Sequence, residues 1–468
     1  MTNKTGLFIF RRDLRIFYNT AFTKALQECD SIIPIFIFTP EQINSNTYKS
    51  NKSVQFMIES LDDLNQSLQE KDGELNIYHG KNTDVIERLI KKYDINALYL
   101  NIDYTPYSKK RDKSIHKLCI KHNVSFNTCH DVCLFVPKTI TTDNSNDVYQ
   151  KFTPFYNKCL ENIKDISFPE KGYFKHNWCK KINDDKRKLI NEVYTEYTVP
   201  SYTSLLRGGR SVVCDFLKNI KEFKDYDNTR DNLNKETTQL SAYLKYGCIS
   251  VKELYKILLD NNFDKKHSLI RQLIWRDFYI HILDSHPRVL NGKAFKEKYE
   301  SLKWDNTPSY FECWKKGLTG FPIVDACMRQ LNTVGYMQNR GRLIVASFLI
   351  KTLFIDWRKG EKYFAKNLID YDPAANNGNW QWVAGSGVDS QPYFRIFNPW
   401  SQGEKHDKEA EFIKKWCPEL KNIPSKDIHK WYEKCDKYIN DDDIKYPKPI
   451  VDYSEKRKYV LEQYKKVV

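Results

Sequence analysis

The first part of the chain alternates short apolar runs with longer charged segments whose apolar residues recur every three or four positions. The apolar runs cover residues 6–10, 32–38, 75–78 and 97–101. Short buried strands that alternate with amphipathic helices are typical of a parallel sheet covered by helices on both faces. We therefore predict an α/β domain with a doubly wound parallel sheet in residues 1–135.

The pattern changes after residue 135. From 136 to 200 the regular spacing fades and four prolines interrupt the chain, which predicts an interdomain linker with a few short helices. Beyond the linker, apolar residues follow helical spacing, for example over 251–259, 269–283, 323–331 and 343–353. Residues 201–468 are therefore expected to form a larger all-α domain.

Composition narrows the class of protein. No apolar run approaches the roughly 18 residues that span a bilayer, and the N-terminus lacks the layout of a signal peptide. We expect an intracellular soluble protein without a membrane partner, in the cytoplasm or the nucleus. The twelve cysteines form no paired C-x-x-C pattern, so reduced thiols and no metal site are expected.

The chain is basic, with 75 Lys and Arg against 60 Asp and Glu and a formal charge of +15. Such an excess favours a polyanionic partner, because basic groups that neutralise phosphates release counterions. A solvated lysine-rich surface would give the same excess. Tryptophan is more informative, since nine of the ten lie after residue 270.

The segment after the first predicted strand argues against nicotinamide chemistry. The strand continues into an Arg-Arg-Asp-Leu-Arg sequence at 11–15. A dinucleotide-binding fold needs a glycine-rich turn at this point so that the backbone can approach a pyrophosphate. The sequence therefore disfavours a dehydrogenase.

Hydroxyl side chains precede a short apolar helix at 237–247. Thr237, Thr238 and Ser241 come before a helix that we expect to end at Gly247. Backbone N–H groups and the helix dipole could bind phosphate there. A helix that is simply capped by Ser or Thr would have the same sequence.

A mixed polar and aromatic helix face follows at 271–279. Gln272, Trp275, Arg276 and Tyr279 are spaced so that they share one face. Such a face can line a solvent-filled pocket. The alternative interpretation is that Trp275 belongs to the core and Arg276 to the surface, without a functional role.

Candidate functional residues are densest at 368–382. If a helix begins near Ala374, Asn376 and Trp380 share a face, whereas Trp382 points to nearly the opposite side. Two tryptophans that fill a core would be the simpler interpretation. It would leave the neighbouring Asp370 and Asp372 without a role.

Several motifs occur in the order found in one known family, at 11–15, 237–247, 273–277, 319–326, 339–342, 376–382, 397–399 and 402–404. Together they resemble the photolyase/cryptochrome family, and most closely its class I cyclobutane pyrimidine dimer photolyases. The resemblance implies a carbon–carbon lyase in which light-excited reduced FAD transfers an electron to a flipped-out dimer in single- or double-stranded DNA. The alternatives are a (6-4) photolyase and a cryptochrome photoreceptor without repair activity. We also expect a monomer.

The resemblance assigns roles to residues of this chain. Those matching the family's FAD contacts are Tyr226, Thr237, Thr238, Leu240, Ser241, Arg276, Arg342, Asp370, Asp372 and Asn376. The tryptophans matching its electron-transfer relay are Trp304, Trp357 and Trp380. Those matching catalytic and lesion-pocket positions are Gln272, Trp275, Asn339, Asn376 and Trp382, and the DNA contacts are Arg230, Gln272, Trp275, Tyr279, Asn339, Arg340, Arg395 and Gln402.

Two departures from the family bear on the lesion. Gln272 stands where cyclobutane dimer enzymes usually have Glu. At this position the chain is more similar to the (6-4) photolyases. Residues 336–343, however, contain no histidine where (6-4) enzymes place a proton donor. Neither Gln338 nor Asn339 can act as a general acid at neutral pH. We therefore predict repair of the cyclobutane dimer.

A second chromophore is expected in some members of the family. Residues 101–112 match the antenna region, but Tyr107 and Ser108 stand where folate-binding members tend to have Asn and Glu. The antenna could therefore be a deazaflavin, a folate or a flavin, and it could also be absent.

Overall fold

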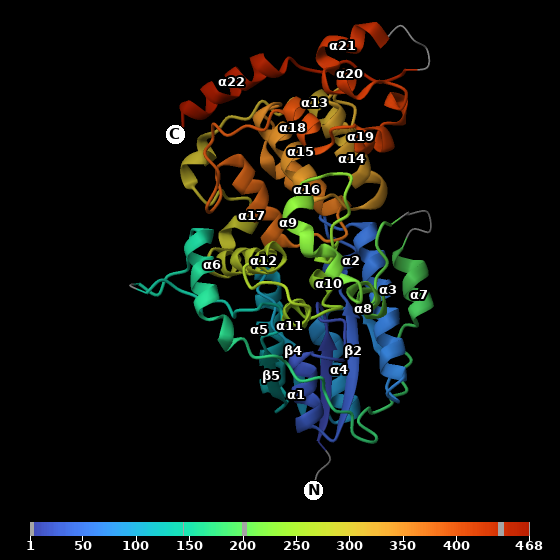
Figure 1. Ribbon diagram of the computed structural model, residues 1–468. Helices are drawn as coiled ribbons and strands as arrows, with labels where there is room; N and C mark the ends of the chain where they lie inside the picture. The colour runs from blue at the N-terminus through green and yellow to red at the C-terminus, as the bar shows by residue number, and fades with distance from the viewer. Residues whose placement is uncertain (1–3, 144, 199–203, 439–443, 468) are drawn as a thin grey trace. The chain divides into compact units, whose positions relative to one another are not determined.

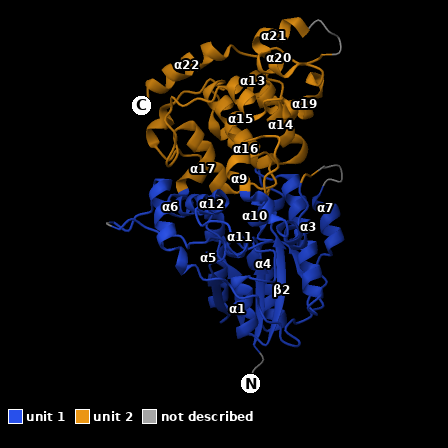
Figure 2. Cartoon of the chain, viewed as in Figure 1, with its two compact units in different colours: residues 1–202, 206–224, 240–287 blue, residues 203–205, 225–239, 288–468 orange. Residues whose placement is uncertain are grey.

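The computed structural model describes residues 4–143, 145–198, 204–438 and 444–467. These residues form two compact units, which are coloured separately in Figure 2. The first takes its described residues from 1–202, 206–224 and 240–287, and the second from 203–205, 225–239 and 288–468. The domain boundaries at 135 and 200 remain predictions, and residues 199–203, where the predicted linker ends, lie outside the described residues.

The first unit is built on a parallel sheet, as predicted (Figure 1). Its five strands have the order β3-β2-β1-β4-β5. Their bounds are β1 Thr5–Phe10, β2 Ser31–Phe38, β3 Asn76–His79, β4 Ala97–Asn101 and β5 Ser125–Cys129. We did not predict β5, an edge strand whose residues are exposed or half-buried and therefore carry no apolar run.

The central strands are buried on both faces. Every residue of β1 and β4, and every residue of β2 except Ser31, is buried, and Leu7, Ile35 and Leu98 belong to one apolar cluster with the flanking helices. Strands of a parallel sheet that are covered on both sides need apolar residues at every position. This explains why the central strands appear in the sequence as continuous apolar runs.

Helices connect these strands and continue beyond the sheet. Those of the first unit are α1 Thr20–Glu28, α2 Pro40–Ile43, α3 Asn51–Gln69, α4 Asn82–Tyr93, α5 Pro106–Lys121, α6 Phe152–Glu161, α7 Ile190–Tyr197, α8 Arg210–Leu217, α10 Ser241–Tyr246, α11 Val251–Asp260 and α12 Ser268–Ser285. The 3₁₀ helices of the chain are η1 Ile163–Asp165, η2 Ile220–Asp225, η3 Pro287–Asn291, η4 Glu297–Ser301 and η5 Pro418–Leu420. Among its described residues, the predicted linker thus holds only the short helices α6, η1 and α7.

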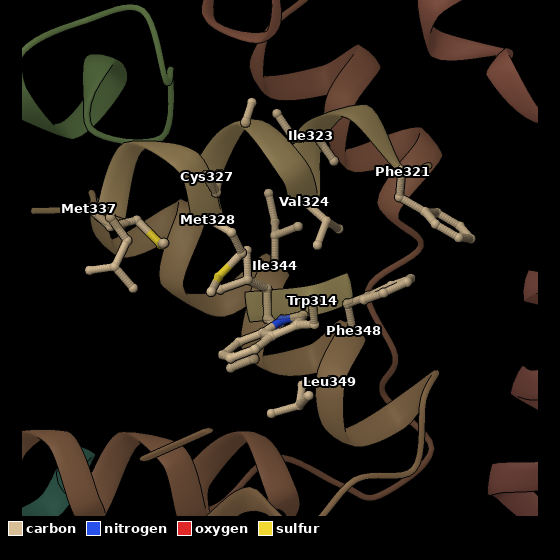
Figure 3. Packing of buried hydrophobic residues seen from close by; sticks show 14 of the residues in the cluster. Trp314, Phe321, Ile323, Val324, Cys327, Met328, Met337, Ile344, Phe348 and Leu349 are labelled. Atoms are coloured by element: carbon tan, nitrogen blue, oxygen red, sulfur yellow. The ribbon is translucent and has the colours of Figure 1, made fainter. Parts of the chain in front are cut away.

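The second unit is helical, as predicted. Its helices are α9 Tyr226–Thr229, α13 Pro308–Lys316, α14 Pro322–Val334, α15 Asn339–Lys351, α16 Trp357–Asn367, α17 Pro373–Ala384, α18 Pro399–His406, α19 Glu411–Trp416, α20 Ser425–His429, α21 Trp431–Tyr438 and α22 Tyr453–Lys465. Figure 3 shows the apolar core around Trp314, Phe321 and Phe348. Across the described ranges, no helix combines the length and apolarity needed to cross a membrane.

Candidate active site

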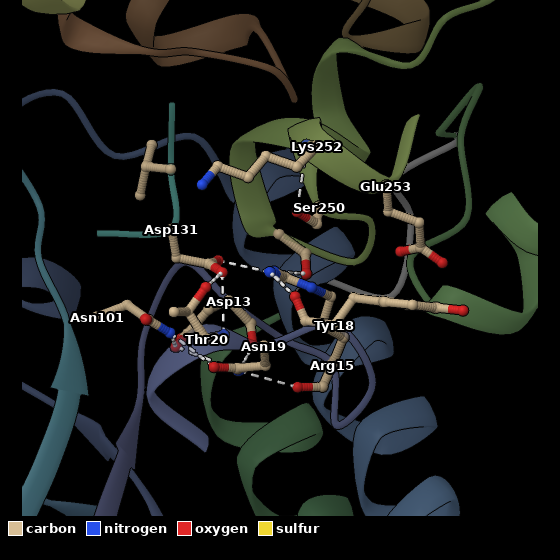
Figure 4. A network of polar contacts seen from close by, with 12 residues as sticks. Asp13, Arg15, Tyr18, Asn19, Thr20, Asn101, Asp131, Ser250, Lys252 and Glu253 are labelled. Carbon is tan, nitrogen blue, oxygen red and sulfur yellow. Dashed lines mark hydrogen bonds and ion pairs between the residues drawn. The ribbon is translucent and has the colours of Figure 1, made fainter. Parts of the chain in front are cut away.

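The segment that follows β1 holds α10 in place. Leu14 N donates to Tyr246 O over 3.0 Å, and Arg15 Nη1 donates to Gly247 O over 3.0 Å. Arg15 is itself buried in an ion pair with Asp131 (Figure 4). The Arg-rich motif at 11–15 therefore serves to anchor the end of α10, at whose start Leu240 and Ser241 lie.

The start of α10 is not a conventional cap. The N-cap residue is Leu240, which makes no side-chain capping hydrogen bond, and the helix ends at Gly247 with φ +65°. The alternative that a Ser or Thr simply caps this helix is therefore wrong. The phosphate-binding role of Thr237, Thr238 and Ser241 stays a prediction.

Helix α12 brings together the aromatic residues predicted to share a face. The rings of Trp275 and Tyr279 stack with centroids 5.8 Å apart, and Trp275 is half-buried. Tyr279 is only 4% exposed. Trp275 also stacks on Phe152 of α6, with ring centroids 3.5 Å apart and an interplanar angle of 7°. Gln272 lies one turn earlier and is half-buried.

Two adjacent residues of α12 hold the segment after β5. Arg276 Nη1 donates to Val132 O over 2.6 Å, and Asp277 Oδ2 accepts from Phe135 N over 2.9 Å. Asp277 is fully buried, and no described residue donates a hydrogen bond to its Oδ1. Burial raises the pKa of Asp277 to about 7, although Arg276 and the backbone donors favour the charged form.

The buried carboxyl of Asp277 predicts a pH-dependent stability. Because its pKa is higher in the folded than in the unfolded chain, its contribution is complete below about pH 4 and is lost as pH rises towards 7. Asp277→Asn keeps an acceptor for Phe135 N and removes the titration. Between pH 5 and 8, urea unfolding should therefore show the wild type losing about 2–4 kcal/mol more stability than the variant. Equal pH profiles would contradict the assignment.

In the second unit, Arg342 and Asp370 form the predicted pair. Arg342 Nη2 donates to both carboxylate oxygens of Asp370, over 3.1 and 2.8 Å. Its Nε donates to Met337 O over 2.7 Å, which fixes the guanidinium against the chain that precedes α15. The pair thus places a rigid acceptor just before α17.

Asp372 and Asn376 are positioned by α17 itself and by α16. Asp372 is the N-cap of α17 and accepts from Ala374 N and Ala375 N. Asn376 Nδ2 donates to the backbone oxygen and to Oε1 of Glu361, each over 3.1 Å. This orientation leaves Asn376 Oδ1 as an acceptor to which no described residue donates.

The remaining predicted flavin contacts of this unit are partly buried polar groups. Burial raises the pKa of Tyr226 to about 12, so its phenol stays protonated as a donor. Thr237 Oγ1 lies 3.1 Å from the hydroxyl of Tyr336. Thr238 is half-buried in the segment between α9 and α10.

The two tryptophans of α17 differ in burial, as expected from spacing that places them on different sides of the helix. Trp380 is 3% exposed and packs edge-on against Phe364 at 4.9 Å, whereas Trp382 is half-buried. Trp357 is buried, and Trp304 packs against Phe354 at 4.9 Å. Within the described part of the chain, no ring contact joins Trp304, Trp357 and Trp380, so the relay stays a prediction.

The predicted DNA contacts of the second unit are more accessible. Asn339, the first residue of α15, and Arg395 are exposed, while Arg230, Arg340 and Gln402 are half-buried. Arg340 is paired with Asp231. The guanidinium groups of Arg340 and Arg395 both lie over Phe397, at 6.0 and 5.9 Å from the ring centroid.

Comparisons with known proteins decide the family. Residues 7–172 match the family model "DNA photolyase", and residues 269–466 match "FAD binding domain of DNA photolyase". Two relatives, from Buchnera aphidicola of Acyrthosiphon pisum and from Escherichia coli K12, are each named deoxyribodipyrimidine photo-lyase. The Buchnera protein is 37% identical over 98% of this chain and 96% of its own length. The Escherichia coli protein is 33% identical over 98% of this chain and 98% of its own length. The chain belongs to the DNA photolyase family.

Solved photolyase structures agree with the fold. An archaeal photolyase from Sulfolobus tokodaii, described with two FAD molecules, has a TM-score of 0.86 and 39% identity over 99% of this chain and 100% of that chain. A class III photolyase from Agrobacterium tumefaciens has a TM-score of 0.89 and 31% identity, and the match covers 100% of this chain and 98% of that chain. The predicted family, fold class and FAD-binding domain are thereby confirmed.

The residues present fit the flavin of a photolyase. Leu240, Ser241 and Arg276 belong to the first unit, and the other predicted contacts belong to the second. In the second unit, the open acceptor of Asn376 and the fixed Arg342–Asp370 pair supply the mixed donors and acceptors that a flavin ring requires. The individual contacts remain predictions.

The structure adds residues that the sequence analysis missed. Glu361 orients Asn376 by accepting a hydrogen bond from its amide, and the ring of Phe152 stacks on that of Trp275. In α15, Ser347 Oγ accepts from Phe397 N, and Lys351 Nζ donates to Arg395 O, so this helix holds the backbone on either side of residue 396. The spacing of aromatic residues at 152, 155 and 156 is helical and could have revealed α6. The other three contacts join segments distant in sequence, so spacing carries no signal for them.

Proposed function

We propose that this chain is a light-driven photolyase that splits cyclobutane pyrimidine dimers in DNA. The observation that carries the proposal is the near full-length match to relatives named deoxyribodipyrimidine photo-lyase, including an FAD-binding domain that spans 269–466. When bound in its reduced form, FAD supplies the excited electron that opens the dimer. The basic charge of the chain suits a DNA substrate.

The chain itself holds the lesion and the DNA. A dimer stacked in a duplex is inaccessible and has to be flipped out, which costs less for a damaged base pair. Trp275 and Trp382 are each proposed to contact the flipped-out dimer, and Gln272 and Asn339 are proposed to hydrogen-bond the pyrimidine edges. Arg230, Arg340, Arg395 and Gln402 hold the phosphate backbone, which positions the duplex without reading its sequence.

The structure favours the cyclobutane dimer over the (6-4) product. Repair of the (6-4) product needs a proton donor. Gln338 is buried and donates to Lys235 O, and a glutamine does not ionise. His406 lies near Arg340 and Asp231, but burial and the Arg340 charge lower its pKa to about 4. His406 is therefore neutral at physiological pH and is a poor general acid.

Illumination of defined substrates tests this proposal. Photoreduced protein is mixed with oligonucleotides that carry either a cyclobutane dimer or a (6-4) product, and the intact lesions are counted after exposure to blue light. We expect loss of the first lesion only. Loss of only the second would reverse the lesion assignment, and loss of neither would favour a photoreceptor without repair activity.

The antenna and the quaternary state belong to the same proposal. The Sulfolobus tokodaii photolyase is described with two FAD molecules, with the implication of a novel light-harvesting cofactor. By analogy, we propose a flavin as the antenna of this chain, which a flavin-to-protein ratio near two would support. The protein is further proposed to act as a monomer in the compartment that holds its DNA, the cytoplasm or the nucleus.

A further inference from the structure

Arg271 is an exposed arginine of α12, one turn before Trp275. Its guanidinium carbon lies over two rings of α6, at 5.5 Å from the centroid of Phe152 and 5.2 Å from that of Tyr156. Phe152 and Tyr156 are themselves stacked at 5.6 Å. The side chain is thus supported by a two-ring platform on a neighbouring helix of the same unit.

The charge of Arg271 is not neutralised by an ion pair. No carboxylate in the described part of the chain lies within ion-pair distance of it, although Asp264 is near enough to influence Tyr156. Arg340 and Arg342, by contrast, are paired with Asp231 and Asp370. Arg395, a predicted DNA contact, resembles Arg271 because its guanidinium also lies over a phenylalanine.

An arginine supported by aromatic rings is well prepared to bind a phosphate. The ring quadrupole attracts the face of the guanidinium, whereas its N–H groups point outward in the guanidinium plane. Such a fork matches two phosphate oxygens, and the platform limits the rotamer freedom that binding would remove.

We infer that Arg271, held over Phe152 and Tyr156, binds a DNA phosphate that flanks the lesion. The inference rests on the proposed function, since Trp275 marks the position of the lesion. Phe152 is in addition a positioning residue, because its ring stacks on Trp275 and thereby fixes the orientation of the indole that contacts the lesion. One aromatic residue thereby supports both the backbone contact and the lesion contact.

The test compares DNA binding by the FAD-loaded protein in the dark, by fluorescence anisotropy at several salt concentrations. Arg271→Gln should weaken binding to dimer-containing and undamaged duplexes by the same factor. The slope of log Kd against log salt should fall by about 0.9, as expected when one phosphate contact is lost. The matched control is Lys117→Gln, which removes one exposed charge from α5 of the same unit and should leave the slope nearly unchanged.

A second variant separates the two roles of the platform. Phe152→Leu removes the ring but keeps an apolar side chain, and we expect it to reduce the preference for the dimer-containing duplex by roughly fivefold. Far-ultraviolet circular dichroism and flavin absorbance show whether the variant is folded and loaded. Trp275→Ala should lower the same preference, whereas Arg271→Gln should leave it unchanged.

The outcomes distinguish this inference from the proposed function. If the wild type does not prefer dimer-containing DNA, the proposed function fails and the inference fails with it. If the wild type prefers the dimer but Arg271→Gln keeps the wild-type salt slope, only the phosphate contact is wrong. If Phe152→Leu keeps the full preference for the dimer, Phe152 has no positioning role.

Discussion

Replacing Gly247 with alanine should destabilise the first unit by at least about 3 kcal/mol, with a loss of bound flavin. Gly247 has φ +65°, a conformation that costs other residues about 1–2 kcal/mol. An added Cβ would also lie 2.2 Å from Arg12 O and 2.6 Å from Asp13 Cα. Both are backbone atoms after β1, so no side-chain rotation can relieve the clash. Urea unfolding followed by circular dichroism and the flavin-to-protein ratio measure the two effects.

Gly172 supplies the matched control for the backbone conformation. It also has a positive φ, of +88°, but an added Cβ would meet no atom closer than 3.4 Å. Gly172→Ala should therefore cost only about 1 kcal/mol and retain the flavin. Similar losses for the two variants would show that the contact between α10 and the end of β1 is not tight.

This contact also shows the limit of sequence analysis at the site. The periodicity predicts that a helix ends at Gly247, and the absence of a glycine-rich turn disfavours a dehydrogenase. Neither observation indicates that Arg15 donates to Gly247 O, because the two residues are 232 positions apart. The local pattern of apolar residues indicates which face of a helix or strand is buried. It does not indicate which residues, distant in sequence, that face contacts, because tertiary packing determines those contacts.

The same distinction explains the other outcomes. Of the strands predicted from apolar runs, β1, β2 and β4 are buried almost throughout, whereas the edge strand β3 exposes His79. The other edge strand, β5, was missed because its residues are exposed or half-buried and form no apolar run. The face shared by Trp275 and Tyr279 follows from helical spacing and is present. Phe152, which covers Trp275, lies in the segment predicted to be a linker, so the platform under Arg271 was not anticipated.

Replacing Gly360 with alanine should slow photoreduction of the flavin and lower stability by about 1–3 kcal/mol. Gly360 lies within α16, where alanine normally stabilises a helix by about 1 kcal/mol. Here an added Cβ would lie 2.2 Å from Trp380 Cη2, 2.4 Å from its Cζ3 and 2.6 Å from Leu349 Cδ2. The indole fits against the backbone of α16 only because residue 360 has no side chain, so the substitution must displace Trp380.

A double variant tests whether displacement of Trp380 causes both effects. Trp380→Phe removes the ring atoms that meet the new Cβ, so Gly360→Ala should cost less stability in that background, by about 1–2 kcal/mol. Trp380→Phe alone should slow photoreduction, and Gly360→Ala should add no further slowing to it. Chemically reduced protein should repair DNA at a similar rate in all three variants. Additive losses of stability, or normal photoreduction in Gly360→Ala, would show that Trp380 keeps its place and that the tight packing between α16 and α17 does not govern electron transfer.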